Sequence, residues 1–184
     1  MKILGISGRK GAGKDTIARE LTALLPAIRI MQHGFAYPLK EFMVNVFEVP
    51  RAAIYGDDAA KNQPMPHNPA MTIRQAAQAM CDTIKTVDRL APVRFGMAFA
   101  DCYRSYCDWF MFTDVRFREE VEAIQQTGGK VIRLLRGDSS DNHKTESAGD
   151  DPTIPWDAII DNRGQTVAET LGAVLTYLKG WNYV

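Results

Sequence analysis

The chain has 184 residues, 46% hydrophobic and 24% charged, a composition typical of a globular protein that buries its own core. Lys plus Arg and Asp plus Glu number 22 each, so the formal net charge is zero, which disfavours a nucleic-acid partner. The three cysteines form no CxxC pair. This argues against a zinc site or a disulfide framework and favours a reducing compartment.

Residues 3–6 form an apolar run too short for a signal sequence, and no apolar stretch reaches the length of a membrane span. We therefore expect a cytoplasmic protein with no membrane partner. The length predicts one α/β domain over residues 1–184, with room for a small insertion or a lid. The sequence leaves a homodimer open.

Hydrophobic periodicity predicts the elements in chain order. The first four are a strand over 2–7, a helix over 15–25, a strand over 28–31 and a helix over 38–47. Residues 50–69 contain four prolines and are interpreted as a loop or insertion, with a short helix left open. A helix over 73–87 follows, with Thr72 as a candidate cap. The next elements are a helix over 95–106, a strand over 109–113 and a helix over 117–126. The last elements are a strand over 131–135, a polar loop over 137–152, a strand over 158–160, and a helix over 166–178.

Strands that alternate with helices in this way are typical of βαβ units. The sequence therefore predicts an α/β fold with a mostly parallel, five-stranded sheet flanked by helices. In such sheets the functional loops follow the carboxyl ends of the strands.

The most specific motif is GxxxxGK over residues 8–14, between a predicted strand and a predicted helix. Glycines let the backbone wrap a phosphate, and the helix N-terminus adds positive potential. Lys14 is placed to reach the β- and γ-phosphates of a nucleotide. This context favours a P-loop over a glycine-rich turn with a surface lysine. The residues expected to bind the nucleotide are Gly8, Lys10, Gly11, Ala12, Gly13, Lys14, Asp15 and Thr16.

One departure concerns the residue after Lys14, which is usually a Ser or Thr that binds Mg²⁺. Here Asp15 takes that place and Thr16 follows. Asp15 could hold Mg²⁺ through water, or it could cap the helix and leave Thr16 to assist. Both alternatives stay open.

Several segments together resemble the phage-type deoxynucleoside monophosphate kinases over most of the chain. These landmarks are residues 7–16 (SGRKGAGKDT), 35–41 (FAYPLKE), 72–78 (TIRQAAQ), 113–119 (TDVRFRE), 128–136 (GGKVIRLLR), 143–146 (HKTE) and 159–162 (IIDN). The sequence departs from the family at Tyr37, where Asp is frequent, and at Arg118-Glu119, where the family has Asn-Glu.

The resemblance implies a P-loop nucleoside monophosphate kinase plan similar to adenylate kinase. It implies a helical acceptor-binding segment at about 37–92 and a lid at about 137–152. It also implies ATP and Mg²⁺ as cofactors and a deoxynucleoside monophosphate (dNMP) as the small-molecule substrate, with dNDP as product.

Asp114 follows the apolar run 109–113, where a carboxylate fits a Walker-B-like role toward Mg²⁺ or its waters. The alternative is a strand-end Asp that caps the following helix. Arg116 lies two residues on and faces the same way if the strand continues; by resemblance it contacts acceptor or phosphates.

Phosphoryl transfer needs cations on the phosphate oxygens, and arginine forks suit them. Arg136 is the better candidate for a catalytic arginine, and Arg133 for substrate binding; surface salt bridging is the alternative for both. By resemblance, Lys40 and Arg74 contact the acceptor phosphate, although basic residues on helices are usually only solvated. Glu146 lies in the HKTE landmark and is also assigned to the substrate. The run 138–146 lacks the spacing of a calcium or zinc site.

We therefore expect Lys14, Asp114 and Arg136 to be catalytic, and Asp15, Thr16 and Asp114 to serve Mg²⁺. A kinase of another phosphorylated metabolite, of the phosphomevalonate or dephospho-coenzyme A type, remains an alternative. So does a non-catalytic nucleotide-binding protein. A nucleic-acid 5′-kinase is disfavoured by the zero net charge.

Overall fold

The computed structural model describes residues 1–136 and 148–184. These residues form two compact units, one of Met1–Gly34 with Met97–Val184 and one of Phe35–Gly96. The segment expected to bind the acceptor, 37–92, falls within the second unit. Its binding role stays a prediction.

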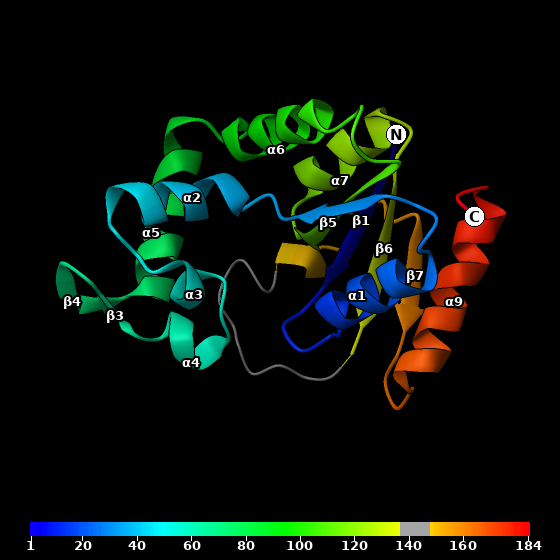
Figure 1. The fold of residues 1–184 in the computed structure, drawn as a ribbon, viewed down its shortest axis with the longest axis horizontal. Helices are drawn as coiled ribbons and strands as arrows, with labels where there is room; N and C mark the ends of the chain where they lie inside the picture. The colour runs from blue at the N-terminus through cyan, green and yellow to red at the C-terminus, as the bar shows by residue number, and fades with distance from the viewer. Residues whose placement is uncertain (137–147) are drawn as a thin grey trace. The chain divides into compact units, whose positions relative to one another are not determined.

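The first unit is built on a sheet of five parallel strands in the order β2-β5-β1-β6-β7 (Figure 1). The strands are β1 (Lys2–Gly8), β2 (Ile30–His33), β5 (Trp109–Val115), β6 (Lys130–Leu135) and β7 (Ala158–Asp161). The expected α/β class and five-stranded parallel sheet are confirmed. Because β1 lies between β5 and β6, the segments that follow these three strands emerge side by side at one edge of the sheet.

Helices cover both faces of this sheet. On one face, α1 (Lys14–Leu24) and α9 (Val167–Gly180) pack on a core that includes Leu4, Leu21 and Leu178, all fully buried. On the other face lies α7 (Arg118–Gln126), whose Ile124 packs near Gly5 of the central strand. Burying apolar side chains on both faces is what a central parallel strand requires, and it fixes β1 and the loop that follows it.

The second unit is mainly helical. Its elements are α2 (Tyr37–Val46), α3 (Arg51–Ile54), α4 (Asp58–Lys61), β3 (Pro64–Met65), β4 (Asn68–Thr72) and α5 (Ile73–Val87). The buried side chains of Met43, Ile54 and Ile73 contribute to its core. Thr72 caps α5 as expected, because its hydroxyl accepts the Gln75 N–H at 3.1 Å and Gln75 Oε1 accepts the Thr72 N–H at 2.9 Å.

Three local expectations need correction. Residues 50–69, interpreted as a loop or insertion with a short helix left open, contain the short helices α3 and α4 and also the start of an antiparallel hairpin of β3 with β4, which was not expected; prolines are tolerated in so short a ribbon because its strands have free edges. The helix expected over 95–106 is α6 (Ala91–Cys102). It begins earlier because Pro92 fits a first helical turn and Asp88 Oδ1 accepts the Leu90 N–H at 3.0 Å.

The third error is the strand expected over 28–31, which lies two residues later, at Ile30–His33. Arg29 precedes it and is held by Asp108, whose Oδ2 accepts the Arg29 backbone N–H at 3.0 Å. Within residues 1–136 and 148–184, no helix combines the length and apolar character needed to cross a membrane.

Candidate active site

The GxxxxGK motif forms the turn between the central strand β1 and the helix α1. Gly8 ends the strand with φ of 151°, and a methyl group there would lie 2.8 Å from the carbonyl oxygen of Leu134. Only glycine fits this combination of backbone angle and close approach. The strand, glycine-rich loop and helix expected from the sequence are therefore present in that order.

The Lys14 side chain folds back over the loop. Its Nζ donates to the carbonyl oxygens of Gly8, at 2.6 Å, and Arg9, at 2.9 Å. The Arg9 carbonyl also accepts the Ala12 N–H at 3.0 Å. The ammonium group thus lies within the loop itself, where a phosphate cradled by the loop would meet it.

Asn162 contacts the glycine-rich loop, and sequence analysis assigns it no role. It follows β7, is 1% exposed, and donates from Nδ2 to the carbonyl oxygen of Ala12 at 3.1 Å. Its backbone N–H donates to the Leu135 carbonyl at 3.0 Å. A buried side chain therefore attaches the loop to the segment that follows the edge strand β7.

Asp114 lies near the carboxyl end of β5, beside β1, and is half-buried. Its carboxylate packs on the Gly34 backbone just after β2, since a methyl group at Gly34 would lie only 2.2 Å from Asp114 Oδ2. Because Gly34 has no side chain, the Asp114 carboxylate can occupy the space beside it. Asp114, expected just after a strand over 109–113, lies within the last residues of β5 (Trp109–Val115), and its chemical role stays a prediction.

Arg116 follows β5 in a segment fixed by Glu120. The Glu120 side chain is 5% exposed, and its Oε2 accepts the N–H groups of Arg116, at 2.7 Å, and Phe117, at 3.1 Å. This contact begins α7 and directs the backbone that carries Arg116. Sequence analysis did not identify Glu120, although an acidic residue three positions after a helix start is a capping signal.

The two arginines of the β6 region differ in environment. Arg136 follows β6, is exposed, and has its Nη1 3.8 Å from where a methyl group at Gly13 would lie. Arg133 is on β6 itself and only 8% exposed. The Arg133 Nη2 pairs with Asp150 Oδ1 at 2.5 Å, and its guanidinium lies 5.2 Å from the centroid of the Trp156 ring. The Arg136 guanidinium therefore lies beside the glycine-rich loop, whereas that of Arg133 is packed against Asp150 and the Trp156 ring.

In the second unit, Arg74 lies in the first turn of α5. It donates to Asp58 Oδ1 at 2.5 Å and to Asn62 Oδ1 at 3.2 Å. These two acceptors hold the guanidinium in one orientation, and neither was singled out from the sequence. The role of Arg74 toward a phosphate stays a prediction.

Lys40, on α2, lies with its Nζ 5.0 Å from the centre of the Tyr55 ring. The Tyr55 hydroxyl donates to Glu41 Oε1 at 2.7 Å, and burial together with this hydrogen bond raises the pKa of Tyr55. The phenol therefore stays neutral and presents a ring face to the lysine, a favourable cation–π arrangement.

The candidate magnesium residues on α1 lie in its first turn, where Asp15 is exposed and Thr16 half-buried. Among the described residues, no group of three or more His, Cys, Asp or Glu side chains could hold a metal ion. Asp114 is the third candidate, on β5. Glu146 and residues 137–147 of the expected lid lie outside the described residues.

Comparison with known proteins agrees with the resemblance stated above. The chain is 29% identical over 159 residues to a protein of Acanthamoeba polyphaga mimivirus named "Putative deoxynucleotide monophosphate kinase". The similarity covers 79% of this chain and 81% of the viral protein. No protein-family model matches the chain. The resemblance to deoxynucleoside monophosphate kinases therefore extends over most of both sequences.

Proposed function

We propose that this chain is a deoxynucleoside monophosphate kinase that transfers the γ-phosphate of ATP to a dNMP, giving dNDP and ADP. The observation that carries the proposal is the glycine-rich loop between β1 and α1, with the Lys14 ammonium within it and Arg136 beside Gly13; we interpret this loop as a P-loop. The similarity to the viral protein, which is named as a kinase, supports the same reaction class.

Lys14 and Arg136 are the cations proposed to neutralise charge on the transferred phosphoryl group. Such transfers proceed in line between oxygens and need positioning and charge stabilisation rather than a covalent intermediate. Arg136, at the loop, can present a planar fork to phosphate oxygens. Neither residue needs to move a proton in this reaction.

The oxygen atoms of Asp15, Thr16 and Asp114 suit Mg²⁺ or its waters, although these three residues offer only a few ligands. When bound, Mg²⁺ would neutralise charge that develops on the phosphates, and the protein would supply few of its ligands. The packing of Asp114 on Gly34 supports a fixed carboxylate.

The acceptor is proposed to be bound by Lys40, Arg74, Arg116, Arg133 and Glu146. Arg74 is the best supported because Asp58 and Asn62 orient its guanidinium, and an oriented fork loses less entropy on binding a phosphate dianion. Among the members of this set that the structure describes, Arg133 is the least accessible, being 8% exposed. A cytoplasmic location and the absence of nucleic-acid and membrane partners complete the proposal.

A coupled assay tests this function and separates the alternatives. ADP formation from ATP is followed with each dNMP and NMP, and with phosphomevalonate and dephospho-coenzyme A, at equal concentrations. We expect acceptor-dependent turnover with at least one dNMP. Turnover only with a non-nucleotide acceptor would transfer the assignment to another metabolite kinase, and nucleotide binding without turnover would contradict catalysis.

A further inference from the structure

A carboxylate lies between two guanidinium groups at the edge of the P-loop. Asp150 accepts from Arg9 Nε, at 3.3 Å to Oδ1 and 3.1 Å to Oδ2, and also from Arg9 Nη2. Its Oδ1 accepts from Arg133 Nη2 at 2.5 Å. The hydrogen bonds from Arg9 and then from Arg133 lower the pKa of Asp150. The carboxylate is therefore charged at neutral pH and holds two cations close together.

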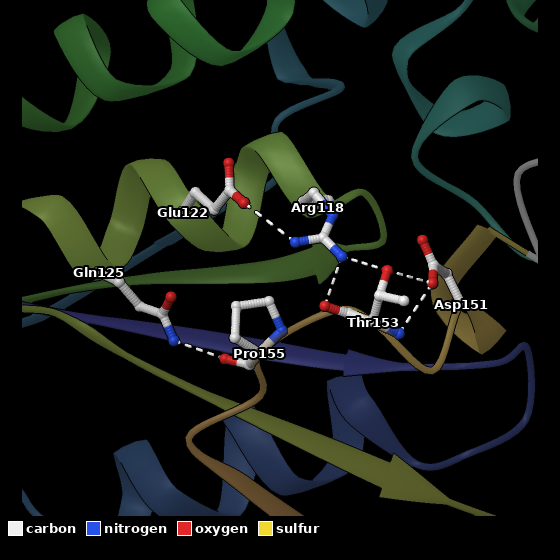
Figure 2. Close-up of polar contacts among 6 residues, drawn as sticks. All are labelled: Arg118, Glu122, Gln125, Asp151, Thr153 and Pro155. Carbon is white, nitrogen blue, oxygen red and sulfur yellow. Dashed lines mark hydrogen bonds and ion pairs between the residues drawn. The ribbon is translucent and has the colours of Figure 1, made fainter.

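Asp150 belongs to a segment that is attached to α7 (Figure 2). Arg118 donates from Nη2 to the carbonyl and hydroxyl oxygens of Thr153, and Gln125 Nε2 donates to the Pro155 carbonyl at 2.6 Å. Asp151 Oδ1 in turn accepts the Thr153 N–H at 2.8 Å. Because α7 is packed on the sheet, its contacts hold the chain just after Asp150 in place.

Arg133 supplies the second fixed point. It lies on β6, where it is paired in register with Ser7 of β1, and its guanidinium packs 5.2 Å from the Trp156 ring centroid. A residue that is 8% exposed on an interior strand of the sheet has little conformational freedom. Arg133 on the sheet therefore holds Asp150 directly, and α7 holds the chain that follows Asp150.

Arg9 connects this carboxylate to the loop. Its side chain pairs with Asp150, and its backbone carbonyl accepts both Lys14 Nζ, at 2.9 Å, and the Ala12 N–H, at 3.0 Å. The placement of Arg9 therefore sets the placement of the loop carbonyl on which the Lys14 ammonium rests. A contact made by the Arg9 side chain is thus transmitted to the loop backbone.

We propose that Asp150 is a positioning residue, which acts through Arg9 to hold the P-loop in the conformation that receives the phosphates of the nucleotide. The inference rests on the proposed function and deepens it. Asp150 itself touches no substrate. A loop fixed before the nucleotide arrives spends less of the binding free energy on ordering.

The test compares Asp150→Asn, which keeps the size and one acceptor but loses the charge, with a control variant, Asp101→Asn, which removes the charge from the exposed Asp101–Arg104 ion pair. ATP binding is measured by titration calorimetry without acceptor, and amide hydrogen exchange over residues 8–13 is measured without nucleotide. Because the Arg9–Asp150 pair is about one-third exposed, we expect a modest loss of ATP affinity, roughly three- to tenfold. Amide exchange in the loop should be faster in Asp150→Asn than in the control variant.

A double-mutant cycle with Arg9→Gln isolates the contact. If Asp150 acts through Arg9, the double variant binds ATP no more weakly than the weaker-binding of the two single variants. Additive losses of ATP affinity in the double variant, or amide exchange in the loop that is unchanged in Asp150→Asn, would overturn the proposal. Tighter ATP binding by Asp150→Asn would also overturn it, because it would mean that Asp150 competes with phosphate for Arg9. A wild-type chain that phosphorylates no dNMP would overturn the proposed function instead, whereas loop exchange and the cycle would still decide the positioning role.

Discussion

Asn162 and Ala12 are joined by a buried hydrogen bond of 3.1 Å from Nδ2 to the carbonyl oxygen, across 150 positions of the sequence. Among the described residues, Asn162 Oδ1 is buried and has no hydrogen-bond partner. The amide nitrogen is the atom of this side chain that contacts the glycine-rich loop. It holds the Ala12 carbonyl, which precedes Gly13 and the start of α1.

Replacing Asn162 with Ala should destabilise the protein by about 1–3 kcal/mol, because a buried carbonyl loses its donor. ATP affinity should fall as well, since the loop loses an attachment. Asn162→Asp should be at least as harmful, because a carboxylate cannot donate to Ala12. Denaturant unfolding and ATP titration measure both effects, with Asn45→Ala, an exposed side chain that donates to the Glu41 carbonyl at 2.8 Å, as the control. Wild-type stability and affinity in Asn162→Asp would contradict the role of the amide.

Lys14→Ala should fold normally and lose about 10²–10³-fold in kcat, the cost of one well-placed charge-stabilising group. The Lys14 side chain rests on loop carbonyls and lies outside the core, so the melting temperature should change little. Steady-state kinetics and thermal unfolding are compared with Lys179→Ala, a lysine in the last turn of α9. Near-normal turnover by Lys14→Ala would remove the basis of the P-loop assignment.

Gly34→Ala should displace the Asp114 carboxylate, because the added methyl group would lie 2.2 Å from Oδ2. If Asp114 serves Mg²⁺ or its waters, kcat should fall and the Mg²⁺ concentration at half-maximal activity should rise. Gly172→Ala is the matched control: its methyl group meets nothing within 4 Å, so this helical position should be neutral or slightly stabilised. Equal Mg²⁺ dependence in both variants would argue for a structural role of Asp114.

Arg74→Ala should raise the KM for the dNMP and leave ATP affinity nearly unchanged, because only the acceptor's phosphate loses a cation. Arg74→Lys should give a partial defect, since the charge stays but the fork that Asp58 and Asn62 orient is lost. Arg94→Ala, which breaks a different arginine–aspartate pair in the same unit, controls for the loss of surface charge. If ATP binding weakens while dNMP binding does not, the assigned roles are reversed.

The main features of the fold were predictable because the signals were local. An apolar run followed by glycines marks β1 and its loop, and apolar spacing marks α1 and α9. The β3–β4 hairpin was not predictable, since Pro64 and Pro69 are typical of loops and only pairing with a partner strand makes the segment extended. The start of α6 was missed for a similar reason, because the side chain of Asp88 caps it.

The candidate site divides in the same way. The motif identifies Lys14 and its glycines, and the position after a buried strand identifies Asp114. The IIDN landmark includes Asn162 without indicating its role, and nothing local marks Asp150; both residues act through contacts across the fold, with Ala12 and Arg9 respectively. Asp58, the partner of Arg74, is likewise recognisable only once α4 and α5 are folded.

The most direct measurement follows a labelled γ-phosphate from ATP in the presence of each dNMP, with wild-type protein and with Lys14→Ala. The reaction proposed here predicts that the label appears in a dNDP, in one-to-one amount with ADP, and that the variant forms it at least about a hundredfold more slowly. Label released as free phosphate at the same rate with and without acceptor, or none transferred to any dNMP, would contradict the assignment as a deoxynucleoside monophosphate kinase.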